Sequence, residues 1–431
     1  MRKKVRKILF LICLVLFLLV SPLVVLYSQG YRLNFNPPTG RIKITQTGGL
    51  FLKAWPRQVE IYLDSKLVKK TDWFFGSVFI ENLLPKKYKV LVKKDGFHLW
   101  EKTLEIKEKE VTEAKKYRFM ASKSEFFPCK SRSRKLLVFS RPGKKIILLN
   151  EESEKEGWSL KLYDVERGIQ SYLVTEKEIH PQGAELLNLD FSVDSKRVSL
   201  EIGAAERIKY FDLEIDRIPP TLVEEEPPFV PLDRVIAYQK LNDDVYYLNN
   251  FGHLFKTNLS FESQTKISEK PFALLPETEY QLKVCGDFIF LKEGENLYIF
   301  NSESKTFEKF FSPFRGLRVS PNSEKLMYWS DSEIWILFLK KGVIPSPEYT
   351  EEKLFLVRLS EKINDVIWLN SDYFAFILGN MIKITETDTR DRLNIIDFAT
   401  LEKPQMFFNT NNQKLYILSG GNLQSSPKLL P

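Results

Sequence analysis

An uncharged apolar run near the start of the chain constrains the fold more than any other feature. Residues 8–27, ILFLICLVLFLLVSPLVVLY, carry no charged side chain over 20 positions. A helix rises ~1.5 Å per residue, so this run would cover ~30 Å, the thickness of the hydrocarbon core of a bilayer. We therefore predict that residues 8–27 form a transmembrane helix in contact with the lipid bilayer, and that residues 1–7 form a cytoplasmic basic tail.

The charges that flank this run predict its orientation. Residues 1–29 contain no acidic side chain and five basic ones, which are Arg2, Lys3, Lys4, Arg6 and Lys7. By the positive-inside rule, the N-terminus stays cytoplasmic and the rest of a single-pass cell-membrane protein becomes extracytoplasmic. The alternative is a cleaved secretory signal with residues 8–20 as its apolar core, in which Ser21 and Pro22 break the helix. Both alternatives export the remainder of the chain.

The charge balance differs between the two parts that follow. Residues 30–120 hold 19 Lys/Arg and 10 Asp/Glu, whereas residues 121–431 hold 40 and 46. A chain of 431 residues accommodates two or three domains. A basic part near the membrane therefore precedes a larger, mildly acidic part. Export and the acidic larger part argue against a nucleic-acid partner.

Residues 31–120 show the period-two alternation of half-buried strands. The alternating apolar positions are Val59, Ile61 and Leu63; Tyr88, Val90 and Val92; and Trp100, Leu104 and Ile106. Asp95 and Gly96 form a turn signal between the last two segments. About six short strands over this length predict a compact antiparallel β-sandwich.

Three segments of this region resemble the PEGA domain family. They are VEIYLDSKLVKKT at residues 59–71, LPKKYKVLV at residues 84–92 and KDGF at residues 94–97. The resemblance implies an extracytoplasmic β-sandwich associated with the cell envelope, without catalytic residues. Ser65 and Lys87 stand where the family pattern prefers glycine, so positive φ angles there would imply altered turns or strain.

Five lysines on one hairpin form the candidate binding site for an anionic surface: Lys86, Lys87, Lys89, Lys93 and Lys94. They either form a solvated edge that resists aggregation, or attract anionic lipid headgroups or cell-wall polymer. A second group, Trp55, Trp73, Phe74, Phe75 and Trp100, either fills the core of the small domain or forms a sugar-stacking surface. Core filling is the favoured interpretation, since a small domain needs aromatic bulk.

Residues 130–431 contain a loose repeat in which a polar turn precedes an apolar strand. The strands of the seven instances start at or near positions 136, 197, 245, 288, 326, 373 and 415, at a mean spacing of about 46 residues. Such spacing is typical of β-propeller blades, and VSPNSEKL at residues 319–326 resembles TolB-type propellers. The predicted fold is thus an all-β ectodomain, made of a small PEGA-like β-sandwich and a β-propeller of about seven blades, with one N-terminal transmembrane helix.

Catalytic motifs are missing from the sequence. It contains no GxSxG, HExxH, Walker A or strand-following GxGxxG pattern, and His98, His180 and His253 are isolated from one another. We therefore predict no enzyme activity, no cofactor and no metal. A Cys129–Cys285 disulfide is conceivable outside the cytoplasm, with unpaired thiols as the simpler alternative.

These features predict a membrane-anchored extracytoplasmic binding or scaffold protein that acts through protein–protein contacts. Its partner would be an unknown envelope protein or cell-wall polymer. The alternative is recognition of cell-wall glycan or peptidoglycan by the propeller or by the basic β-sandwich, and a third class is an enzyme with a site spread over propeller loops. The residues at the mouth of the propeller discriminate between these functions. Carboxylates together with histidines there would favour an enzyme, and exposed stacked aromatics would favour binding of a sugar. A flat apolar rim would favour binding of a protein.

Overall fold

A computed structural model of the chain divides into two compact units. The first comprises residues 1–123 with residues 388–394 and Pro431, and the second comprises residues 124–387 with residues 395–430. The residues that the structure describes are 3–34, 43–118, 126–132, 135–139, 145–151, 157–180, 184–192, 194–204, 207–225, 234–241, 243–339 and 353–429.

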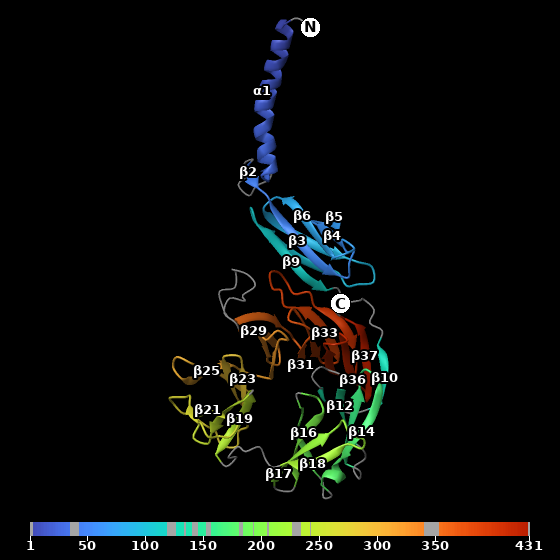
Figure 1. Ribbon diagram of the computed structural model, residues 1–431, viewed down its shortest axis with the longest axis vertical. Helices are drawn as coiled ribbons and strands as arrows, with labels where there is room; N and C mark the ends of the chain where they lie inside the picture. The colour runs from blue at the N-terminus through green and yellow to red at the C-terminus, as the bar shows by residue number, and fades with distance from the viewer. Residues whose placement is uncertain are drawn as a thin grey trace. The chain divides into compact units, whose positions relative to one another are not determined.

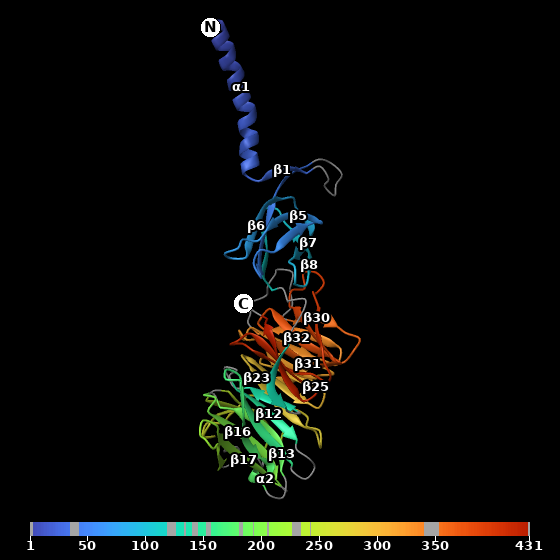
Figure 2. The same cartoon turned by 90° about the vertical axis from the view of Figure 1, so that its right-hand side faces the viewer.

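The first element is the helix α1, Lys3–Ser28, which runs without interruption through Pro22 (Figure 2). Its segment Leu9–Ser28 has a mean hydropathy of 3.2 and no buried residue. The signal-peptide alternative predicted that the helix breaks at Ser21 and Pro22, and this prediction is wrong. The helix is long and apolar enough to cross a bilayer, a property that membrane anchors and signal sequences share.

A small hairpin and a two-sheet sandwich follow α1. The hairpin pairs β1, Tyr31–Asn34, with β2, Lys43–Gln46. One sheet has the order β6-β3-β9 and the other β5-β4-β7-β8. Their strands are β3 Gly48–Trp55, β4 Glu60–Leu63, β5 Lys66–Lys70, β6 Ser77–Leu83, β7 Lys86–Lys93, β8 Trp100–Ile106 and β9 Val111–Arg118. Because β3 and β9 pair in parallel, the expectation of a wholly antiparallel sandwich is wrong.

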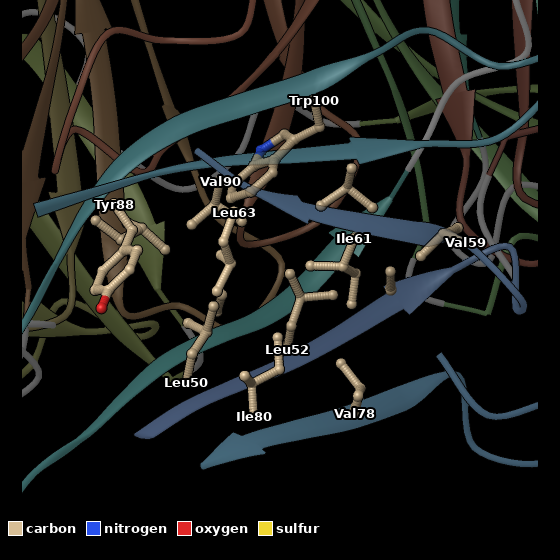
Figure 3. Close-up of a cluster of buried hydrophobic side chains, with 14 of the residues drawn as sticks. Leu50, Leu52, Val59, Ile61, Leu63, Val78, Ile80, Tyr88, Val90 and Trp100 are labelled. Carbon is tan, nitrogen blue, oxygen red and sulfur yellow. The ribbon is translucent and has the colours of Figure 1, made fainter. Parts of the chain in front are cut away.

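The core of the sandwich lies between these two sheets, as Figure 3 shows for Leu50, Leu52 and Ile61 among others. The three predicted alternations are confirmed, since all nine of their apolar side chains are buried. Lys102 in β8 is a charged residue on the same face as Trp100 and Leu104, and it has no exposed surface.

The two glycine replacements within the PEGA-like pattern have different consequences. Asp64 and Ser65 have φ angles of 48° and 67° between β4 and β5. Two positive φ angles are what a two-residue type I′ hairpin turn requires, so the strain expected at Ser65 is present. Lys87 instead lies inside β7 and is not among the described residues with positive φ, so the expectation fails there.

The second unit contains seven four-stranded antiparallel sheets within its described residues, which agrees with the predicted repeat count. Blade 1 is β11 Lys135–Phe139, β12 Lys145–Glu151, β13 Trp158–Asp164 and β14 Ile169–Thr175; blade 2 is β15 Glu185–Phe191, β16 Arg197–Ala204, β17 Arg207–Glu214 and β18 Thr221–Glu225; blade 3 is β19 Val235–Leu241, β20 Asp244–Asn249, β21 Leu254–Asn258 and β22 Thr265–Lys266; blade 4 is β23 Tyr280–Cys285, β24 Phe288–Glu293, β25 Asn296–Asn301 and β26 Thr306–Phe311. Blade 5 is β27 Gly316–Val319, β28 Lys325–Trp329, β29 Glu333–Phe338 and β30 Lys353–Arg358; blade 6 is β31 Ile363–Trp368, β32 Tyr373–Leu378, β33 Met381–Glu386 and β34 Ile396–Thr400; blade 7 is β35 Gln405–Asn409, β36 Lys414–Ser419, β37 Asn422–Lys428 and β10 Phe127–Arg132. A short helix, α2 Glu176–Ile179, follows blade 1.

Blade 7 closes the ring, because β10 from the start of the unit pairs with β37 near its end. Figure 1 shows the blades following one another around the ring in chain order. The first strands of several neighbouring blades contact each other, as β19 and β23 do. This arrangement is a β-propeller.

The repeat positions found in the sequence fall on two kinds of strand. Six of them lie in the second strand of their blade, as Leu326 does in β28, whereas Leu136 lies in the first strand, β11. The spacing from 136 to 197 is therefore longer than the others. The predicted start of the propeller at residue 130 falls inside β10.

Apolar side chains of neighbouring blades seal one another. One buried cluster joins blades 1 and 2, others join blades 3 and 4 and blades 4 and 5, and a fourth joins blades 1 and 7. A single four-stranded blade exposes both faces, so each blade needs its neighbours for stability. Cys129 packs on the fourth cluster and Cys285 belongs to the third, and both thiols are free.

Candidate functional site

The five predicted lysines lie on one hairpin, but carboxylates accompany several of them. Lys86 Nζ is 2.6 Å from Asp64 Oδ2, and Lys89 Nζ is 3.1 Å from Glu101 Oε2. The hydrogen bond between Lys86 and Asp64 raises the pKa of the lysine and lowers that of the carboxyl. These two lysines are thus partly neutralised.

The other three lysines differ in their surroundings. Lys94 is half-buried and donates to the backbone carbonyl of Arg57. Lys93 is exposed and helps to lower the pKa of Glu60, although less than the hydrogen bonds from Lys70 and Tyr62 do. Lys87 is exposed at the start of β7. The outer face of this sheet therefore mixes both signs of charge, which weakens the basic field that the sequence suggested.

The aromatic group separates into buried and exposed members. Trp100 is 4% exposed, whereas Trp73, Phe74 and Phe75 are 67%, 62% and 70% exposed. Trp55 is half-buried and meets Phe97 edge to face, with 6.4 Å between ring centroids. Core filling is therefore confirmed for Trp100 and wrong for the three consecutive aromatics, which we call the aromatic loop.

The aromatic loop is held in shape by its flanking residues. The carboxylate of Asp72 accepts hydrogen bonds from the backbone N–H groups of Phe74, Phe75 and Ser77, and these bonds lower the pKa of Asp72 to about 2. Gly76 closes the loop with a φ of 65°, where a Cβ would lie 2.5 Å from a backbone carbonyl oxygen. In a strand, three successive aromatics would place large rings on both faces, which differs from the apolar–polar alternation of a half-buried strand. This run between Asp72 and Gly76 is therefore a sequence signal for a loop.

A pocket of about 810 Å³ opens at the centre of the propeller. Its lining comes mainly from the first strands of blades 2, 3, 4 and 5, which are β15, β19, β23 and β27. The volume lies within the range of ~300–1,000 Å³ that small-ligand pockets occupy.

Blade 2 contributes an acidic wall to this pocket. Asn188 in β15 pairs directly with Glu201 in β16, and Asp190 lies two residues further along β15. Side chains two apart on a strand, and side chains directly opposite across a ladder, share a face. Asn188, Asp190 and Glu201 therefore point to the same side of blade 2 and line the pocket together.

Blade 4 repeats this arrangement with the opposite charge. Gln281 in β23 pairs directly with Lys292 in β24, and Lys283 lies two residues further along β23. These three also line the pocket. The same ladder positions thus hold an amide and two acids in blade 2, and an amide and two bases in blade 4.

Blade 3 forms the surface between the two walls. Tyr238 and Lys240 of β19 line the pocket there. Burial, followed by the charge of Glu201, raises the pKa of the Tyr238 hydroxyl, so it stays protonated at neutral pH. The backbone N–H of Val284 donates to Gln239 Oε1 at 2.6 Å and links blades 3 and 4 beside the pocket.

A second pocket of about 660 Å³ lies between blades 5 and 6, and its charges are paired within the protein. Arg315 makes two hydrogen bonds to Asp331, with Nε–Oδ1 of 2.9 Å and Nη2–Oδ2 of 2.7 Å. Lys362 also contacts Asp331, and Arg318 pairs with Asp365 at 3.2 Å. This pocket therefore offers little uncompensated charge to a ligand.

Neither pocket contains a histidine in its lining. Over the described ranges, no group of three His, Cys, Asp or Glu side chains is placed to hold a metal ion. The centre of the propeller therefore differs from the three surfaces that the sequence suggested, which were carboxylates with histidines, stacked aromatics and an apolar rim. It holds a polar pocket with two oppositely charged walls.

The sequence matches no family model, and no curated protein matches it. Similar solved structures include the WD40 repeats of RRP9, with 11% sequence identity, coverage of 71% of this chain and 99% of that chain, and a TM-score of 0.44. The Cps50 (Swd1) β-propeller domain of Myceliophteria thermophila has 11% sequence identity, coverage of 70% of this chain and 99% of that chain, and a TM-score of 0.43. Another is an oligogalacturonate lyase in complex with manganese, with 10% sequence identity, coverage of 72% of this chain and 96% of that chain, and a TM-score of 0.45. Since the TM-scores stay below 0.5, the fold assignment rests on the strand topology of this chain.

Proposed function

We propose that this chain is a membrane-anchored extracytoplasmic binding or scaffold protein of the cell envelope, and that it is not an enzyme. In this proposal residues 1–7 are cytoplasmic, residues 8–27 cross the membrane, residues 31–120 form a PEGA-like sandwich and residues 130–431 form a TolB-like propeller. The basic residues before α1 support the orientation. The propeller pocket is the surface that contacts a partner protein.

The lining of the 810 Å³ pocket is the observation that carries this proposal. Its side chains include charges of both signs, amides and Tyr238, which suit binding. General acid–base catalysis would favour groups whose pKa is shifted toward neutrality. The shift found at Tyr238 moves its pKa away from neutrality. Binding is therefore better supported than chemistry.

Photo-crosslinking tests the pocket as the binding surface. A benzophenone amino acid at Tyr238 in the full-length protein, expressed in its native membrane, should form an adduct with an envelope protein. The matched control places the same group at Ile169, an exposed residue of β14. Adducts from Ile169 and not from Tyr238 would locate the binding surface elsewhere.

Protease accessibility tests the orientation. The two folded units should be cleaved by protease added outside spheroplasts, while a tag before Arg2 stays protected until the cells are lysed. Protection of the C-terminal end together with cleavage of the N-terminal tag would reverse the topology and remove the basis for an envelope function.

Glycan recognition by the sandwich is a second candidate, favoured by the exposed aromatic loop. Exposed aromatic faces stack on apolar faces of sugar rings, and such rings are rarely left exposed together. Sedimentation with purified peptidoglycan should fall when Trp73 and Phe75 are changed to alanine. Phe251→Ala, at an exposed aromatic of the propeller, is the control and should bind like the wild type.

A further inference from the structure

The geometry of the two charged walls points to the class of ligand that the propeller pocket takes. We infer that it binds an extended peptide segment of mixed charge, with acidic side chains toward Lys283 and Lys292 and basic side chains toward Asp190 and Glu201. This inference rests on the proposed function, because it specifies the part of a partner protein that enters the pocket.

The first argument is that the wall charges lack ion-pair partners among the described residues, although the Asp190 carboxylate accepts a hydrogen bond from the N–H of Phe191. Across the described ranges, no ion pair within 4.0 Å engages Asp190, Glu201, Lys283 or Lys292, nor Lys240 between them. The neighbouring pocket shows the opposite behaviour, since Arg318 and Lys362 there have carboxylate partners, as does Arg315, which lines both pockets. The charges of blades 2 and 4 therefore remain available to a ligand.

The second argument is the separation of the charges by sign. A whole blade lies between the acidic wall on β15–β16 and the basic wall on β23–β24. A uniformly acidic polymer that reached Lys283 and Lys292 would also meet Asp190 and Glu201, and like charges brought together in an interface are costly. A uniformly basic ligand meets the same obstacle at the lysines. Only a ligand with both signs satisfies both walls.

The third argument concerns the neutral groups between the charges. The Asn188 amide accepts from the N–H of Leu189 and keeps its NH2 donors for a ligand, and the Gln281 amide donates to Glu279 Oε1 and keeps one N–H and its oxygen. Tyr238 offers a hydroxyl that remains protonated. These groups match the alternating N–H and C=O groups of a peptide backbone. Peptides also combine acidic and basic side chains along one chain, which a repeating acidic glycan does not.

The experiment measures peptide binding to the full-length protein in nanodiscs of neutral phosphatidylcholine. The probes are labelled dodecapeptides: one with a glutamate block and a lysine block, one acidic, one basic and one of Gly, Ser and Asn. Oligogalacturonate serves as an acidic glycan. The wild type should bind the two-block peptide most tightly, by roughly tenfold or more over each single-sign probe.

Charge reversal of the walls then tests the assignment of each wall. K283E/K292E and D190K/E201K should each weaken binding of the two-block peptide by about tenfold or more, because one wall then repels its block. The combined four-residue variant swaps the walls and should restore binding, since the peptide can enter in the opposite direction. K270E/K309E is the control; it reverses two exposed lysines outside the pocket, one in the connection between blades 3 and 4 and one in β26 of blade 4.

Several results would overturn the inference. One is that the wild type binds an acidic probe or oligogalacturonate more tightly than the two-block peptide. Another is that either wall reversal leaves the affinity for the two-block peptide unchanged, and a third is that the four-residue variant does not recover binding. The milder K283Q/K292Q variant covers the case in which a reversal prevents folding. If Tyr238 crosslinks an envelope protein equally well with either wall reversed, this inference fails while the proposed function stands; if Tyr238 crosslinks none, the proposed function fails.

Discussion

Lys102 Nζ donates a hydrogen bond of 2.6 Å to the backbone carbonyl oxygen of Asp388, which lies 286 positions further along the chain. A second hydrogen bond of 3.2 Å reaches the carbonyl oxygen of Arg392. Both acceptors belong to the segment 388–394, which is part of the same compact unit as the sandwich. Since Lys102 has no exposed surface, these carbonyl groups replace the water that its ammonium has lost.

Replacing Lys102 should therefore destabilise the first unit. Lys102→Met keeps most of the apolar stem but leaves two carbonyl groups without this donor, so the free energy of unfolding should fall by about 1–3 kcal/mol. Urea unfolding of the full-length protein in detergent measures this change. Lys87→Met is the control at an exposed position, with an expected effect of less than about 0.5 kcal/mol. Equal effects of the two variants would contradict a structural role for the buried ammonium.

Two tryptophans of the sandwich form a matched pair with opposite exposure. Trp100 is buried in the core and Trp73 lies exposed on the aromatic loop. Trp100→Ala should lower the free energy of unfolding by about 3–5 kcal/mol, because it removes a large core side chain and leaves a cavity. Trp73→Ala should change it by less than about 0.5 kcal/mol. A large loss of stability for Trp73→Ala in the same unfolding experiment would show that this ring packs after all.

The sequence allowed the parts of this fold that depend on local pattern to be predicted. Val59, Ile61 and Leu63 alternate with polar residues, and a period of two assigns their faces without further information. The repeat that indicates about seven blades is equally local. Core filling by the aromatic loop is a wrong prediction because hydrophobicity alone supports it, whereas three successive aromatics between Asp72 and Gly76 have no strand periodicity.

The candidate site could not be predicted, because it depends on register and on blade order. Asn188 and Glu201 line one wall only because the ladder between β15 and β16 places them opposite each other. Gln281 and Lys292 meet in the same way two blades later in the ring. The partners of Lys102 are also invisible in the sequence, since 286 residues separate it from Asp388.

Asp72 should make the shape of the aromatic loop sensitive to acid. Its pKa is lowered to about 2 in the folded chain, chiefly by the hydrogen bond from the N–H of Phe75, from an ordinary value of 3.8. A carboxyl group whose pKa is lower in the folded chain than in the unfolded chain stabilises the fold when the pH is above its ordinary pKa. This contribution to stability is lost as the pH falls from about 4 toward about 2. The ¹⁹F signal of fluorotryptophan at Trp73 should report a transition in that window. Asp72→Asn should abolish it, and a midpoint near 3.8 in the wild type would mean that the hydrogen bonds contribute little.

The lysine hairpin remains a proposed site for anionic surfaces, with a sharper expectation. Changing all five lysines to glutamine should weaken co-sedimentation with vesicles rich in phosphatidylserine, since each near-surface lysine contributes about 1 kcal/mol at a strongly anionic membrane. Asp64→Asn combined with Glu101→Gln should strengthen it, because these carboxylates now offset Lys86 and Lys89. Both effects should fade at high salt. Unchanged binding of the five-glutamine variant at low salt would remove the electrostatic role.

The thiols of Cys129 and Cys285 should be slow nucleophiles. Burial raises the pKa of both, so at pH 8 a smaller fraction is thiolate, the form that alkylating reagents attack. The two side chains also belong to different apolar clusters, on blade 7 and on blade 4. In a Cys13→Ser protein, iodoacetamide should modify both residues at least about tenfold more slowly in the folded state than in urea, because access and ionisation both oppose the reaction.

Mass spectrometry measures the rates and would also detect the loss of two hydrogens that a Cys129–Cys285 disulfide requires. Rapid labelling of Cys285 in the folded protein would show that blade 4 opens in solution.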